Sequence, residues 1–149
     1  AGSSYLPSEL NAAYLWAQLE MAKDILDNRM ATWNHYNEQL SELVKEGIIE
    51  VPTVPEYCEH NAHMYYIKSK DLEERTELIS FLKTNGINAV FHYIPLHTAP
   101  AGIKYGEFVG EDKYTTKESE RLVRLPLYYN MRQSDVDIVV SYIKKFYRI

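Results

Sequence analysis

The sequence is poor in the residues and patterns that mark several large classes of protein. It has one cysteine, which rules out an intramolecular disulfide and with it a disulfide-rich secreted scaffold. Gly and Pro number six each, too few for a collagen-like or Pro/Gly-rich disordered chain. No apolar run approaches the ~20 residues that span a bilayer, and no basic segment followed by an apolar stretch opens the chain. These absences predict a cytoplasmic globular protein with no membrane partner.

Basic charge is scarce as well. Lys and Arg total 16 against 21 Asp and Glu, which gives a formal net charge of −5. Such a surface repels phosphate backbones unless its basic groups cluster, so we expect no nucleic-acid partner. The residue in excess is tyrosine, with 13 Tyr against 4 Phe and 2 Trp. Tyrosine joins an apolar ring to a polar hydroxyl, which suits interfaces and polar pockets.

Residues 9–46 contain neither Pro nor Gly and predict either one long helix or a kinked pair that follows Ser8 and ends at Gly47. Apolar residues in its first half form two separate helical stripes, so burial is expected on more than one side. The stripes are Leu10, Ala13, Tyr14, Ala17 and Met21, and Leu15, Leu19, Ala22, Leu26 and Met30. We infer that this half packs against something the chain does not fully provide.

The remaining elements predict an α+β fold: a long N-terminal helix followed by a small, mainly antiparallel three-stranded sheet with helices on one face. Residues 48–54 read as an extended edge strand or connector, and residues 93–113 as a long loop without period, which is usually functional or disordered. Pro126 suggests that the third strand is an edge strand. The strands are expected at 62–68, 87–93 and 123–127, and the helices at 71–86 (with a capping box of Asp71 and Glu74), 115–122 (capped by Thr115 with Glu118) and from Ser134 onward.

The first candidate site is the segment 91–97, which delivers His92, Tyr93 and His97 to the mouth of the long loop. Imidazole and phenol groups at a strand end can donate to a phosphate or a sugar hydroxyl. The competing interpretation is a pair of incidental histidines. Spacing alone favours that second interpretation.

Two weaker candidates remain. Cys58, His60 and His63 are residue types that ligate zinc, but their spacing matches no common structural zinc site and incidental histidines explain them better. The Gly-Ser-Ser-Tyr run at 2–5 could offer hydroxyls and backbone N–H groups to an anion. Taken alone, that run is more often just the loop before a helix.

Taken together and in order, these regions resemble the C-terminal part of the DegT-type nucleotide-sugar aminotransferases, which are pyridoxal-phosphate enzymes of fold type I. The likeness covers essentially the whole chain, and the string at 2–20 is specific. It is carried by GSSYLPSELNAAYLWAQLE at 2–20, NAHMYYI at 61–67, FHYIPLH at 91–97, GEDKYTTKESERL at 110–122 and RLPLYYN at 124–130.

The resemblance implies roles for five residues. Ser4, followed by Tyr5, stands where the family has an Asn that contacts the cofactor phosphate across a dimer interface, and Leu6 replaces a family Arg. His92, Tyr93 and His97 match family positions that face the nucleotide sugar and the cofactor. The resemblance therefore reverses the preference for incidental histidines in this segment.

The family's Schiff-base lysine has no counterpart among the ten Lys of this chain, so no catalytic residue is assigned here. We therefore expect residues 1–47 to form a spine helix that links to a missing N-terminal large domain, and residues 48–149 to form the C-terminal small domain. The intact enzyme is expected to be a homodimer that binds pyridoxal 5′-phosphate (PLP) and aminates a dTDP-sugar with glutamate as donor. The fragment alone should be inactive. The alternative is a free-standing α+β module that binds a small ligand.

Overall fold

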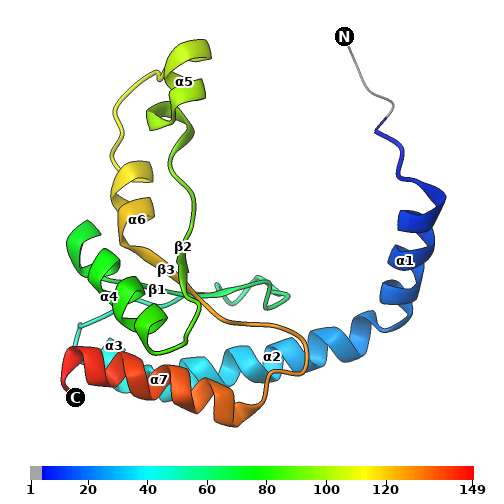
Figure 1. The fold of residues 1–149 in the computed structure, drawn as a ribbon, viewed down its shortest axis with the longest axis horizontal. Coiled ribbons are helices and arrows are strands. Elements are labelled where there is room, and N and C mark those ends of the chain that lie inside the picture. Colours follow the sequence, from blue (N-terminus) through cyan, green and yellow to red (C-terminus); the bar gives the residue numbers. More distant parts are fainter. Residues whose placement is uncertain (1–4) are drawn as a thin grey trace.

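The computed structural model describes residues 5–149 and contains a three-stranded sheet, a group of helices packed against it, and two extensions (Figure 1). No helix in this range is both long and apolar enough to cross a membrane. The α-helices are α1 (Glu9–Glu20), α2 (Ala22–Gln39), α3 (Ser41–Lys45), α4 (Leu72–Thr84), α5 (Pro100–Tyr105), α6 (Thr115–Arg121) and α7 (Gln133–Tyr147). The strands are β1 (Tyr65–Lys68), β2 (Val90–Phe91) and β3 (Leu122–Leu125), and a 3₁₀ helix, η1, spans Leu96–Thr98.

The sheet is antiparallel throughout, as expected, with the order β1-β3-β2. The third strand is therefore central, and the prediction that it is an edge strand is wrong. Pro126 lies just beyond the last paired residue, Leu125, so its missing N–H removes no ladder hydrogen bond. An isolated bridge between Glu50 and Lys68 places the 48–54 connector beside β1.

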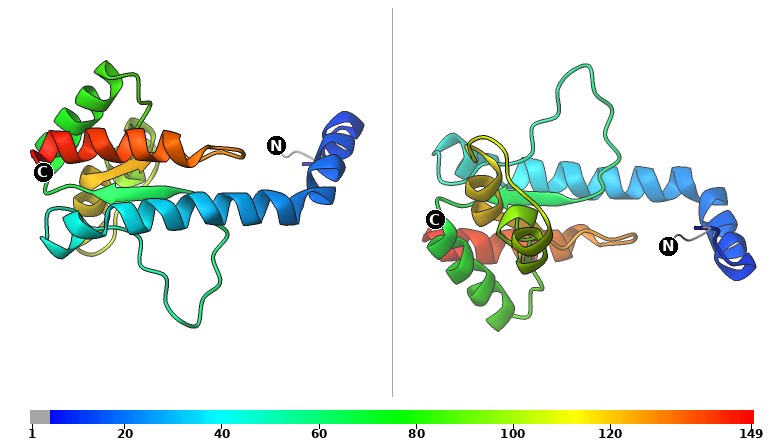
Figure 2. Two further views of the ribbon diagram at one scale, coloured as in Figure 1. Left: turned by 90° about the horizontal axis from the view of Figure 1, so that it is seen from below. Right: turned by 90° about the horizontal axis from the view of Figure 1, so that it is seen from above.

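One face of the sheet carries the hydrophobic core. Residues on opposite faces alternate along a strand, and the register puts Tyr65 opposite Leu125 and Ile67 opposite Val123, all four of them buried. The ring of Tyr36 on α2 stacks on Tyr65 with centroids 5.0 Å apart. Helices α2 and α7 lie side by side beneath this face (Figures 1 and 2). The helical side of the core is Trp33, Tyr36, Leu40, Leu43, Leu78, Leu82, Val136, Val139, Val140 and Ile143.

The N-terminal helical segment is a pair of helices with a break between them, and not one long helix. Met21 leaves helical geometry with φ −101° and ψ 8°, and this separates α1 from α2. Ser8 caps α1 as expected, since its hydroxyl oxygen accepts from the backbone N–H of Asn11. Gly47 has a φ of 71°, the left-handed backbone expected of the residue after a helix.

Helix α1 stands away from the sheet and its helices (Figure 1). None of its residues is buried, and Trp16 is 68% exposed while Leu10 is 83% exposed. This agrees with the prediction that the two apolar stripes find no complete partner within this chain.

The second extension is the arm, residues 93–114, which runs from β2 out to α5 and back to α6 (Figure 1). The sequence predicted a loop here, and the arm instead contains η1 and α5. Helix α5 begins with Pro100, whose fixed φ and missing N–H suit the first turn of a helix. A helix of only six residues is too short to produce a readable period, which is why the sequence pattern missed it.

Besides Ser8, one more predicted N-cap is right and two are wrong. The Asp71 carboxylate accepts from the backbone N–H of Glu74 at 3.0 Å and caps α4. Helix α6 has Tyr114, not Thr115, at its cap position, and no side chain caps it from there. Helix α7 begins at Gln133, so Ser134 lies inside the first turn and cannot act as the cap.

Candidate functional site

His92 and Tyr93 lie where β2 ends and the arm begins. Their rings are 4.7 Å apart and tilted, and Tyr93 is 71% exposed. The backbone of Tyr93 has a φ of 59°, a left-handed conformation that costs a non-glycine residue energy and turns the chain sharply. That turn leaves the phenol of Tyr93 beside the imidazole of His92, so the two predicted site residues are brought together.

Arg124 lies on the same face of the sheet as His92. Val90 is opposite Arg124 in the β2–β3 register, and His92 follows two residues after Val90, so alternation gives all three the outer face, away from the core. Arg124 is half-buried, and no hydrogen bond or ion pair among the described residues holds its guanidinium. Sequence reasoning missed this residue because the register that pairs it with Val90 cannot be read from the chain; strand alternation was the one available signal.

The surroundings of His92 favour its neutral form. Burial lowers its pKa most, and the electrostatic influence of Arg124 and His63 lowers it further. Its Nδ1 is buried and makes no hydrogen bond among the described residues. The outer face thus holds a free guanidinium and an imidazole with an unmet polar atom, an arrangement suited to an anionic or hydroxyl-rich partner.

His97 has its own partners inside the arm. Its Nε2 lies 2.8 Å from Asp112 Oδ2 and 3.3 Å from the hydroxyl of Thr116, and its ring is 4.5 Å from that of Phe108. The carboxylate of Asp112 also accepts from the Thr116 hydroxyl, which holds the pKa of Asp112 below its ordinary value. His97 therefore ties the two legs of the arm together, apart from the His92–Tyr93 pair.

The predicted cofactor contacts lie at the N-terminal end. Ser4 is outside the residues that the structure describes. Tyr5 is 88% exposed and has a φ of 53°.

The zinc interpretation finds no support in the structure. Within residues 5–149 no group of three or more His, Cys, Asp or Glu side chains is placed to hold a metal ion. Cys58 is exposed, and the ring of His60 packs 4.5 Å from that of Trp33 while its Nδ1 accepts from the backbone N–H of Ala62. His60 is thus a packing residue at the edge of the core.

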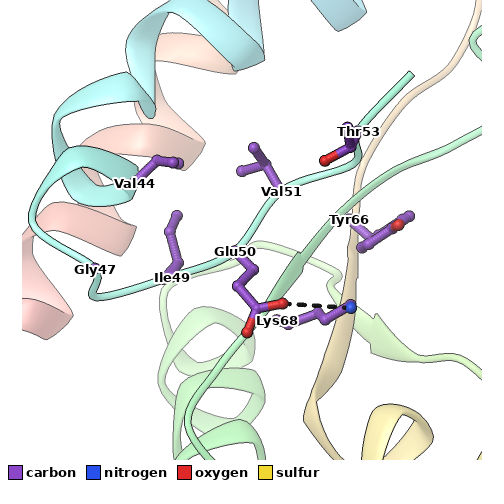
Figure 3. A pocket seen from close by; sticks show the side chains of 8 residues that line it. All are labelled: Val44, Gly47, Ile49, Glu50, Val51, Thr53, Tyr66 and Lys68. Atoms are coloured by element: carbon purple, nitrogen blue, oxygen red, sulfur yellow. Dashed lines mark hydrogen bonds and ion pairs between the residues drawn. The ribbon is translucent and has the colours of Figure 1, made fainter. Parts of the chain in front are cut away.

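A broad hollow of about 480 Å³ lies between the 47–53 segment and β1 (Figure 3). Its charged groups are already paired with each other: Lys68 is 3.4 Å from Glu50 and 2.6 Å from Glu118. Figure 3 shows the first of these contacts crossing the hollow. Because these charges are satisfied, the hollow offers little to a polar ligand.

Comparison with known proteins places the chain in a family. The model of the DegT/DnrJ/EryC1/StrS aminotransferase family matches residues 1–144. The chain belongs to this family. The protein MJ1066 of Methanocaldococcus jannaschii, which is uncharacterized, is 32% identical over 97% of this chain, and the chain spans 38% of that relative's length.

Solved structures show the same fold. S. venezuelae DesV, in complex with a ketimine intermediate, superposes with a TM-score of 0.83 at 20% identity, over 98% of this chain and 40% of its own. Spr1654 from Streptococcus pneumoniae in its PLP form gives a TM-score of 0.74 at 22% identity, over 89% of this chain and 34% of its own. The chain therefore spans about a third to two fifths of the relatives it matches.

The polar groups that the described residues leave available to a group such as PLP lie on the outer face of the sheet. They are the unmet Nδ1 of His92 and the guanidinium of Arg124. Lys68, which lines the hollow of Figure 3, is held by the carboxylates of Glu50 and Glu118. Lys68 is therefore not free there to attach the cofactor covalently.

Proposed function

We propose that this chain is the small domain, with its linking helices, of a PLP-dependent aminotransferase that aminates the keto sugar of a sugar nucleotide. The observation that carries the proposal is the family match over residues 1–144. PLP supplies the electron sink for such chemistry when bound, and the protein supplies binding and orientation. In this chain the orienting groups are His92 and Tyr93, with His97 fixing the arm that follows them.

The outer face supports a sugar nucleotide as substrate on chemical grounds. A nucleoside diphosphate carries negative charge, and Arg124 is a guanidinium with no ion pair among the described residues. Burial lowers the pKa of His92, which favours its neutral form, and a neutral imidazole can donate to or accept from a sugar hydroxyl. Tyr93 can do the same with its exposed phenol.

In finer detail, the sequence resembles dTDP-4-amino-4,6-dideoxygalactose transaminase, an enzyme of enterobacterial common antigen synthesis. We therefore propose dTDP-4-keto-6-deoxyglucose as the acceptor and glutamate as the donor. Both assignments rest on the resemblance of the strings at 2–20 and 91–97.

The proposed partners are an N-terminal large domain and a second copy of the enzyme. Helix α1 supports this, because its apolar side chains remain exposed in the described residues. Ser4 and Tyr5 would hold the phosphate of the cofactor in the neighbouring subunit. The Schiff-base lysine would come from the large domain.

The test uses the protein extended by its upstream segment. His92→Ala and Tyr93→Phe should each lower kcat/KM for dTDP-4-keto-6-deoxyglucose by about tenfold or more, because each removes a hydrogen bond to a polar substrate. Steady-state kinetics measures this effect. Thermal unfolding should be nearly unchanged, since neither side chain belongs to the core.

The matched control is Tyr57→Phe, which removes a phenol that is 90% exposed and lies in the loop before β1. Its kinetics should equal those of the unmodified enzyme. Unchanged kinetics in both site variants would reject the assignment of the 91–97 segment.

A further inference from the structure

A second cavity lies on the other side of β2 from His92. Phe91 is opposite Val123, which is buried in the core face, so Phe91 points to the face opposite His92. The cavity has a volume of about 280 Å³ and lies among the N-terminal half of α4, the end of β2 and α6. Its lining residues are Leu72, Arg75, Phe91, Tyr93, Ile94, Pro95, Thr98, Thr116, Ser119 and Glu120.

Arg75 is the unusual residue of this cavity. A guanidinium has five N–H donors, and the described residues give this one a single hydrogen bond, a long one of 3.4 Å to the carbonyl oxygen of Ser119. Its Nε is buried without a partner, and its Cζ lies 5.2 Å from the centroid of the Phe91 ring. Burial lowers the pKa of Arg75, so its positive charge is poorly compensated.

Two other arginines of the fold are better satisfied. Arg29 donates to the carbonyl oxygens of Ala62 and His63. Arg132 makes two hydrogen bonds to the carboxylate of Asp135. Because buried donors are normally paired, the free donors of Arg75 call for an acceptor that is not part of residues 5–149.

Glu120 supplies the opposite charge in the same cavity. It attracts Arg75 across the space, yet no ion pair within the described chain joins the two. A cavity with a free guanidinium on one side and a carboxylate on the other matches a molecule that carries both charges. A simple anion would be repelled by Glu120, and a simple cation by Arg75.

We propose that this cavity binds a small α-amino acid with an apolar side chain. The carboxylate of the ligand pairs with Arg75, its ammonium group pairs with Glu120, and its side chain packs against Phe91, Tyr93 and Ile94. The cavity volume lies just below the ~300–1,000 Å³ range of drug-sized ligand pockets, which suits an amino acid and is too small for a sugar nucleotide. Tyr93 also belongs to the site of the proposed function, but Arg75 and Glu120, which carry this inference, do not, so either proposal can fail without the other.

The test is a chemical-shift titration of the ¹⁵N-labelled 149-residue chain, whose core is complete enough to hold the sheet and helices together. The probes are L-phenylalanine, 3-phenylpropanoate, which lacks the ammonium group, and 2-phenylethylamine, which lacks the carboxylate. L-phenylalanine should shift the amides of Arg75, Phe91 and Glu120. Each analogue should bind about tenfold more weakly or worse, since each loses one charge-assisted contact.

Two variants separate the two contacts. Arg75→Gln should abolish binding of L-phenylalanine. Glu120→Gln should weaken the binding of L-phenylalanine. It should strengthen the binding of 3-phenylpropanoate, because the Glu120 carboxylate that repels this anion is gone. Glu120→Gln removes a half-buried group with no bonding partner among the described residues, so it keeps the test valid if Arg75→Gln unfolds.

The control variant is Arg132→Gln, which removes a guanidinium outside the cavity and should leave all three affinities unchanged. Equal binding of the three probes, or shifts that cluster away from the cavity, would overturn the proposal. So would L-glutamate binding as tightly as L-phenylalanine, because the apolar wall would then have no role.

Discussion

At the scale of single residues, four charged side chains hold α6 and the 48–54 connector to β1. Arg121 is 2.5 Å from Glu50 and 3.6 Å from Glu118, and its Nε donates to the carbonyl oxygen of Ser69. Lys68 completes the cluster by contacting both glutamates. Two positive and two negative charges balance each other, so the cluster stabilises structure without attracting a ligand.

This cluster predicts how stability changes with pH. The hydrogen bond from Arg121 is the main reason that the pKa of Glu50 lies below its ordinary value of 4.5. A lowered carboxyl pKa contributes stability that is full above 4.5 and is lost as pH falls through the folded-state value. Glu50→Gln should therefore destabilise the chain at neutral pH, by no more than about 1 kcal/mol because solvent screens the exposed carboxylate.

Urea unfolding between pH 7 and pH 3 measures this effect. The advantage of the unmodified chain over Glu50→Gln should shrink toward zero at the acid end. Glu59→Gln is the control, since Glu59 is exposed in the loop before β1, and it should be neutral throughout. An advantage that stays constant down to pH 3 would contradict the ion-pair account.

Residue-scale predictions succeed when the required partners are close in sequence. The Asp71 cap could be predicted because its acceptor and the Glu74 N–H are three residues apart. The cap at Thr115 failed because Thr115 is already the first residue of α6, and the N–H of Glu118 donates to the carbonyl oxygen of Tyr114 instead. The partners of His97 could not be predicted, because Asp112 and Thr116 reach it only after the arm has folded.

At the scale of elements, the tryptophan of α1 and the tryptophan of α2 differ in how far they are buried. Trp33 on α2 is 8% exposed and packs against Tyr65, whereas Trp16 on α1 is 68% exposed. In the 149-residue chain, Trp33→Ala should lower the free energy of unfolding by about 3–5 kcal/mol, and Trp16→Ala should change it by less than about 0.5 kcal/mol. Chemical denaturation of the two variants measures the contrast.

The same pair of variants tests the proposed partner of α1. In the protein extended by its upstream segment, Trp16→Ala should weaken assembly more than it changes the chemistry, which sedimentation and kinetics can separate. An extended variant that remains fully dimeric and equally stable would argue against a covering partner at α1.

The arm depends on one close backbone approach. A Cβ added to Gly102 would lie 1.6 Å from the carbonyl oxygen of Leu96, so any side chain there must push α5 away from η1. Gly102→Ala should raise the hydrogen-exchange rates of α5 and η1 at least tenfold while leaving the core amides protected. Ala101→Ser, at the exposed neighbouring position, is the control and should leave exchange in the arm unchanged.

Loss of protection throughout the molecule in Gly102→Ala would show that the arm is part of the cooperative core.

The sequence did not predict the helices of the arm, because short helices leave no period and Gly102 carries no pattern of its own. The prediction that the third strand lies at an edge failed for a related reason. Pro126 was assigned an edge role from composition, and only the observed register reveals that it follows the ladder instead of interrupting it.

At the scale of the whole molecule, the inner face of the sheet carries the core and the outer face carries the candidate site. The inner face packs on α2, α4 and α7, and the outer face leaves His92 and Arg124 without ion pairs among the described residues. The α+β class and the antiparallel sheet could be predicted from hydrophobic patterning, since that pattern decides which side is buried. The meeting of His92 with Arg124 could not, because it depends on the pairing of strands that are distant in sequence.

The central claim is that this chain is the small-domain part of a PLP-dependent sugar-nucleotide aminotransferase. The most direct measurement compares the 149-residue chain with the protein extended upstream, each mixed with PLP, glutamate and dTDP-4-keto-6-deoxyglucose. We expect the extended protein to give both the visible absorbance of lysine-bound PLP and an aminated sugar nucleotide, and the chain alone to give neither. Turnover by the chain alone, or an extended protein that binds PLP but aminates no sugar nucleotide, would contradict the account.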